Sequence, residues 1–139
     1  MEKELVKQWE ENKHKLENYF RTTKQEEYSD YEDIVRQLFK LCIPKSKDDI
    51  GWDLEKMTVI DDGEYQGTLI FIIPTKRYQP GVDDYIVTDT YYGSCSGCDT
   101  LQGICDHNYG LPNEEQVREY MYLALNLLQK AHWLGTEED

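Results

Sequence analysis

The spacing of apolar residues changes once along this chain, and that change restricts the fold more than any other feature. Residues 3–21 repeat apolar side chains at helical spacing. A second helical pattern opens at residues 29–32, where Ser-Asp-Tyr-Glu matches a capping box, and ends at Ile43 because proline follows. From Met57 onward the apolar runs are rich in β-branched and aromatic residues. We therefore expect two helices followed by strands.

The strands can be placed by their turns. Residues 57–60 and 65–73 form two strand-like runs, and the sequence Asp-Asp-Gly-Glu at 61–64 predicts a hairpin turn between them. Residues 85–92 predict a third strand. A last helical pattern begins near Pro112 and continues to Gly135, which we expect to be its C-terminal cap.

This order of elements predicts an α+β domain. We expect a small antiparallel sheet of about three strands, packed with two N-terminal helices and a long C-terminal helix. A chain of 139 residues is the length of one domain, with a helical part at 1–43 and the sheet, a metal-binding loop and the last helix at 52–134.

A cluster of potential metal ligands follows the third predicted strand. Cys95 and Cys98 form a Cys-x-x-Cys pair, and Cys105 and His107 follow a short distance later. Two thiolates three residues apart can bind one ion through a tight turn, and the second pair can complete a tetrahedron. The spacing therefore predicts a structural Zn²⁺ site that would anchor the link between the third strand and the last helix.

Other ligand sets and other thiol chemistry stay open. Cys42 could replace one ligand, although its apolar surroundings favour a buried thiol. Asp99 and Asp106 could also ligate the ion or orient His107. A thiol-redox or zinc-dependent enzyme that uses Cys95, Cys98 and Cys105 is the alternative function.

The charge is strongly negative and unevenly distributed. The chain carries a net charge of -13, and residues 78–139 hold eleven acidic and only two basic side chains. Such a surface repels phosphates, which argues against direct binding to nucleic acid and favours a basic protein partner. No run of about 20 apolar residues predicts a membrane span, and no apolar signal follows the charged N-terminus. We expect a soluble, intracellular protein with no membrane partner.

The sequence offers binding residues more readily than catalytic ones. It contains no H-E-x-x-H motif and no glycine loop followed by a lysine, and we expect no enzyme activity. Paired acids in turns, such as Asp61 and Asp62, are usually solvated surface. The residues that we expect to bind a partner share an acidic or tyrosine side chain in or near the third strand: Asp83, Asp84, Asp89, Tyr91 and Tyr92.

Residues 92–102 (Tyr-Gly-Ser-Cys-Ser-Gly-Cys-Asp-Thr-Leu-Gln) lie between a predicted strand and a helix rich in leucine and glutamine. This segment resembles small proteins encoded by phages and prophages of Gram-positive bacteria, and in this acidic setting it looks like a zinc-binding type II-A anti-CRISPR protein. The resemblance implies a non-enzymatic inhibitor in the cytoplasm of the bacterial host that binds Cas9, with its guide RNA, and blocks DNA loading. Cas9 is a basic protein with channels for nucleic acid, so an acidic ligand could block such a channel.

Overall fold

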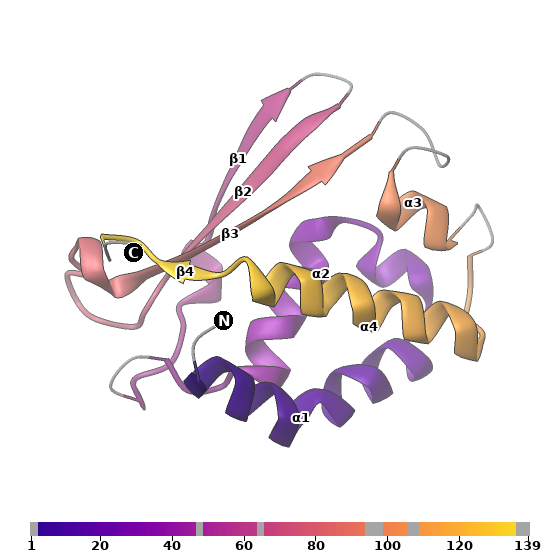
Figure 1. Cartoon of the computed structure of the whole chain (residues 1–139), viewed down its shortest axis with the longest axis horizontal. Coiled ribbons are helices and arrows are strands. Elements are labelled where there is room, and N and C mark those ends of the chain that lie inside the picture. Colours follow the sequence, from indigo (N-terminus) through magenta and orange to yellow (C-terminus); the bar gives the residue numbers. More distant parts are fainter. Residues whose placement is uncertain (1–2, 47–48, 64–65, 94–98, 106–108, 136–139) are drawn as a thin grey trace.

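The computed structural model describes residues 3–46, 49–63, 66–93, 99–105 and 109–135 (Figure 1). It confirms the α+β class. The principal helices are α1 (Lys3–Thr22), α2 (Tyr31–Gln37), α3 (Thr100–Cys105) and α4 (Glu114–Gln129). The strands are β1 (Thr58–Gly63), β2 (Gly67–Pro74), β3 (Tyr85–Tyr92) and β4 (His132–Trp133). Short helical turns are η1 (Gln25–Tyr28), η2 (Leu38–Cys42), η4 (Leu54–Lys56) and η5 (Val82–Asp84).

The sheet is antiparallel, with strand order β1-β2-β3-β4. We predicted about three strands, and the structure has four in its described part. The hairpin is also longer than predicted: Asp61 and Asp62 belong to β1, opposite Leu69 and Thr68, instead of to the turn. The two carboxylates therefore point to opposite faces of the sheet, because side chains alternate along a strand.

Helices cover one face of the sheet, which we call the inner face (Figure 1). Phe71, Ile73 and Ile86 on this face are buried in the common core with side chains of α1, α2 and α4. Thr88 on the same face donates a hydrogen bond to the Leu127 carbonyl of α4. The opposite, outer face carries the alternate residues of each strand.

Four aromatic rings join the two ends of the chain in the core. Phe20 of α1 lies 4.9 Å from the ring of Tyr28 and 5.3 Å from the ring of Tyr120 of α4, and Tyr19 flanks the group. The buried hydroxyl of Tyr120 donates to Gln25 at 2.7 Å, and that of Tyr28 donates to the Phe20 carbonyl at 3.0 Å. The cluster buries large apolar surfaces and leaves neither hydroxyl unsatisfied.

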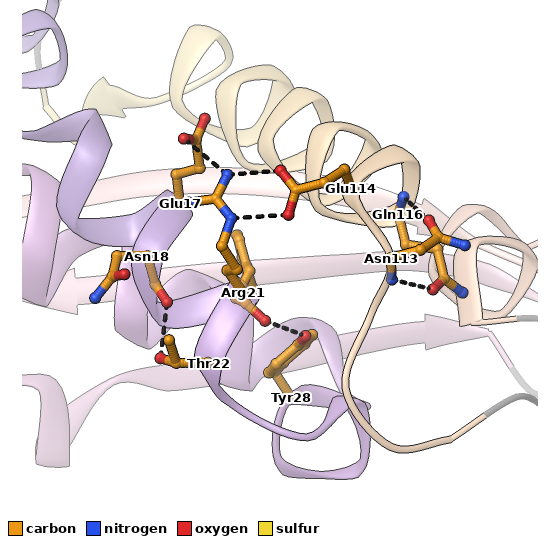
Figure 2. A network of polar contacts seen from close by, with 9 residues as sticks. Glu17, Asn18, Arg21, Thr22, Tyr28, Asn113, Glu114 and Gln116 are labelled. Carbon is orange, nitrogen blue, oxygen red and sulfur yellow. Dashed lines mark hydrogen bonds and ion pairs between the residues drawn. The ribbon is translucent and has the colours of Figure 1, made fainter.

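An ion pair at the surface reinforces the contact between α1 and α4. The Arg21 guanidinium lies between Glu17 of its own helix and Glu114 at the start of α4 (Figure 2), with two bonds to Glu114 at 2.8 and 2.9 Å. Hydrogen bonding to Arg21 lowers the pKa of Glu114. Figure 2 also shows the capping box of α4, in which Asn113 and Gln116 exchange backbone-to-side-chain bonds.

Two helix ends differ from the prediction. The N-cap of α2 is Asp30, one residue later than the Ser29 cap that we expected, and the Asp33 carboxylate accepts a bond from the Asp30 amide. The last helix ends at Gln129, well before Gly135, because the chain turns to pair Trp133 with Ile86 of β3.

Trp133 of β4 stacks on Trp52 with ring centroids 5.4 Å apart, and the amide of the next residue, Leu134, donates to the Tyr85 carbonyl at 2.8 Å. Gly135 has a φ of +83°, and a Cβ there would lie 2.6 Å from Val82. Gly135 therefore serves a turn after β4 instead of a helix cap. Among the described helices, none is long and apolar enough to cross a membrane.

Candidate binding sheet and inner cleft

The structure separates the residues that we expected to bind a partner. Asp83 and Asp84 lie in η5, before β3, where Asp84 pairs with Arg77 at 2.9 Å. Tyr91 lies seven residues further along, which corresponds to about 23 Å in an extended strand. Asp89 and Tyr91 belong to the outer face, whereas Tyr92 belongs to the inner face opposite Gly67. The five residues therefore do not form one patch.

The outer face combines apolar and acidic side chains. Tyr91 is 53% exposed and Ile60 of β1 is 44% exposed, while Ile70 of β2 lies half-buried between their strands. Asp62 and Asp89 are the acidic members of this face, and the Lys130 ammonium approaches Asp89 at 4.0 Å. We call Ile60, Asp62, Ile70, Asp89 and Tyr91 the outer patch. Exposed apolar groups beside charges are typical of a protein-binding surface.

A cleft of about 310 Å³ lies on the inner face of the sheet. We call it the inner cleft. Its apolar walls are Val59, Leu69 and Leu101, and four carboxylates line it: Asp30 and Glu32 at the start of α2, Asp61 of β1, and Asp99 before α3. No lysine, arginine or histidine is among the described residues that line it, although Arg36 pairs with Glu32 at 2.8 Å.

Tyr92 and Asp61 form one wall of the inner cleft. The Tyr92 hydroxyl donates a short hydrogen bond to the Asp61 carboxylate. That bond raises the pKa of Tyr92 to about 12. The phenol is therefore neutral at physiological pH, and the wall carries only the negative charge of the carboxylate.

Asp99 is buried at the end of the cleft and acts as the cap of α3. One carboxylate oxygen accepts bonds from the Tyr31 hydroxyl at 2.9 Å and the Gln102 amide at 3.0 Å, and the other accepts from the Gly93 amide at 2.9 Å. The Tyr31 oxygen in turn accepts a bond from the Leu101 amide. Burial raises the pKa of Tyr31, which keeps it a donor. These bonds give Asp99 a structural role, where we had considered metal ligation.

The predicted zinc ligands fall mostly outside the described residues. Cys95, Cys98 and His107 lie there, as does Asp106. Cys105 is the described member; it ends α3 and is a half-buried free thiol. Within the described ranges, no three His, Cys, Asp or Glu side chains come together as a metal-binding group.

Cys42 is poorly suited to replace one of these ligands. It is the fully buried last residue of η2, and its thiol lies 3.8 Å from the Asn12 carbonyl of α1. Burial raises the pKa of Cys42 to about 12. Because metals bind the thiolate, a site that disfavours the thiolate is typical of a packing residue.

Comparisons with known proteins found no relative of this chain. No family model matches the sequence, and neither a curated protein nor a solved structure matches it.

Sequence reasoning missed the inner cleft. Asp30 and Glu32 were considered only as helix-start residues, and Asp61 only as part of a turn. The sequence did contain one signal: side chains alternate along a strand, so Tyr91 and Tyr92 had to lie on opposite faces of the sheet.

Proposed function

We propose that this chain is a non-enzymatic binding protein that attaches its acidic sheet to a basic host nucleic-acid protein and reduces that protein's access to DNA. The observation that supports it is the outer patch, where the exposed side chains of Ile60 and Tyr91 lie on one face with Asp62 and Asp89. Large apolar side chains supply affinity in protein interfaces, and the surrounding charges select the partner.

The charge distribution supports a basic partner. Residues 78–139 carry a net charge of -9, and β1 adds Asp61 and Asp62 at the adjacent edge of the sheet. Opposite charges accelerate the encounter of two proteins at low salt, and screening over about 8–10 Å weakens this effect at higher ionic strength. The same charges repel free DNA and RNA.

Cas9 is the partner to test first, because residues 92–102 resemble a type II-A anti-CRISPR protein. In a DNA-cleavage assay with Cas9 and guide RNA from several Gram-positive hosts, we expect inhibition when the protein is added before the DNA and little when it is added afterwards. Tyr91→Ala should weaken inhibition by about tenfold, since a central aromatic anchor contributes 1–2 kcal/mol or more.

Tyr78→Ala is the matched control for this assay. Tyr78 is 95% exposed in the segment before η5, away from the outer patch, and its loss should leave inhibition unchanged. Unaltered cleavage at a large molar excess of the wild-type protein would refute Cas9 as the partner. Equal effects of the two substitutions would instead show that the outer patch is not the binding surface.

We also propose one structural Zn²⁺ per chain, held by Cys95, Cys98, Cys105 and His107. The half-buried free thiol of Cys105 is compatible with this role. Elemental analysis of protein prepared without added metal should give about one zinc per chain. Cys105→Ser should lower that value, and Cys42→Ser should not, because Cys42 is buried as a neutral thiol. Less than about a tenth of an equivalent of zinc, with intact thiols, would exclude the site.

A further inference from the structure

The edge of the sheet offers a more specific way to hold the partner that we propose above. β1 is the outermost strand, and within the described residues no other strand pairs with its free side (Figure 1). Five of its six residues are exposed, and Val59 is half-buried. Its pairing with β2 runs from Thr58 opposite Ile72 to Gly63 opposite Gly67 without a bulge. A regular edge strand presents unpaired backbone groups to which another strand can bind.

β1 lacks several of the devices that usually protect an edge. Its sequence, Thr-Val-Ile-Asp-Asp-Gly, contains no proline and no lysine. Its only charges are the carboxylates of Asp61 and Asp62, one on each face. A second copy of this chain would bring the same negative charges to the edge, whereas a basic strand would meet opposite charges. The occupant that fits is therefore an extended basic segment.

The two faces beside β1 specify different side chains on such a segment. On the inner side, a paired strand about 4.8 Å away would place alternate side chains next to Val59 and Asp61, over the inner cleft with its further carboxylates Asp30 and Glu32. On the outer side, the intervening residues would lie next to exposed Ile60. The expected pattern alternates arginine or lysine with an apolar residue.

We propose that β1 binds an extended basic segment of the partner as a fifth antiparallel or parallel strand, with cationic side chains directed to the inner cleft and apolar side chains beside Ile60. This proposal rests on the proposed binding function and states which chemical groups the partner must present. Backbone hydrogen bonds would supply affinity, and the cleft carboxylates would supply the selection for positive charge.

A short peptide of alternating arginine and valine tests the proposal. We expect it to bind the full chain in a fluorescence titration and to slow hydrogen exchange at the amides of residues 58–63. Two N-methylated versions keep every charge, one methylated at the valines and the other at the arginines. Because the N–H groups of alternate residues point to opposite edges of a strand, one version loses the donors that face β1 and should bind at least about tenfold more weakly. A glutamate-valine peptide should not bind.

Asp61→Asn tests the contribution of the protein. The amide oxygen can still accept the Tyr92 hydrogen bond, so the substitution removes mainly the charge. We expect about tenfold weaker peptide binding, and no change for Glu119→Gln, which removes one exposed charge from α4. Equal binding of the unmethylated peptide and both N-methylated versions, or no protection of β1 amides, would overturn the proposal.

The outcome also separates this inference from the proposed function. If Cas9 is inhibited while the peptide does not bind and Asp61→Asn inhibits normally, pairing at β1 is refuted and inhibition stands. If the peptide binds at β1 while Cas9 cleavage is unaltered, edge pairing stands and Cas9 is not the partner.

Discussion

Replacing Phe20 with alanine should lower the free energy of unfolding by about 4 kcal/mol, the largest effect that we expect from a single substitution. Phe20 is fully buried, and its ring contacts Tyr19, Tyr28 and Tyr120. Removal of the ring leaves a cavity bounded by bulky tyrosines, of which Tyr28 and Tyr120 are held by hydrogen bonds, and this restricts its collapse. Urea unfolding measures the change, and the melting temperature should fall by about 14 °C in a chain of this length.

The control for Phe20 is Tyr122→Ala on α4. Tyr122 is 61% exposed, so its removal should change the free energy of unfolding by no more than about 0.5 kcal/mol. Phe20→Leu fills most of the volume and should cost less than half of the alanine change. A loss below about 1.5 kcal/mol for Phe20→Ala would contradict the view that this cluster holds α1 on α4.

Asp99→Ala should lower the free energy of unfolding by about 3 kcal/mol, the second largest effect. The substitution leaves the Gly93 and Gln102 amides and the Tyr31 hydroxyl without their acceptor. A buried polar group that loses its partner costs about 1–3 kcal/mol, and loss of a helix cap costs about 1 kcal/mol. Hydrogen exchange should also accelerate at the amides of α3.

Asp99→Asn distinguishes the bonds from one another. One carboxylate oxygen accepts from both Tyr31 and Gln102, and an amide oxygen can replace it; the other accepts from Gly93, and an NH₂ group cannot. We expect a loss of about 1–2 kcal/mol, between wild type and alanine. Equal stabilities of the asparagine and alanine variants would show that the bond to Gly93 dominates and the helix cap contributes little.

The sequence was sufficient for the fold class because its strongest patterns extend over long segments. The apolar period of α1 and the β-branched run of β2 persist through several turns or residue pairs, so local preference and burial agree. Their limits were less accurate. Aspartate has a low preference for strands, yet Asp61 and Asp62 belong to β1 because they pair with Leu69 and Thr68 of β2.

Two elements could not be predicted because distant residues form them. α3 has six residues with Gly103 in the middle, and its intrinsic preference for a helix is weak. It forms where Tyr31 and Asp99 accept its first amides, and Tyr31 is 70 positions before Leu101. β4 has only two residues, and its pairing with Ile86 and Val87 cannot be read from two positions.

The sequence suggested which types of residue would form the candidate site, but not which of them lie on the same face of the sheet. Acidic and tyrosine residues in β3 were expected to act together, but strand alternation assigns Tyr91 to the outer patch and Tyr92 to the inner cleft. The contribution of Asp30 and Glu32 depends on how α2 approaches the sheet, which is a tertiary arrangement. The Zn²⁺ site stays a prediction.

The stacked rings of Trp52 and Trp133 provide an intrinsic spectroscopic probe of the C-terminal strand. Trp52 precedes β1 and Trp133 lies in the last strand, so their contact exists only while β4 is attached to the sheet. Two closely stacked indoles couple their electronic transitions, which produces a paired near-ultraviolet circular dichroism band. The third tryptophan, Trp9, belongs to α1. Detachment of the C-terminal strand could therefore be followed in solution without any added label.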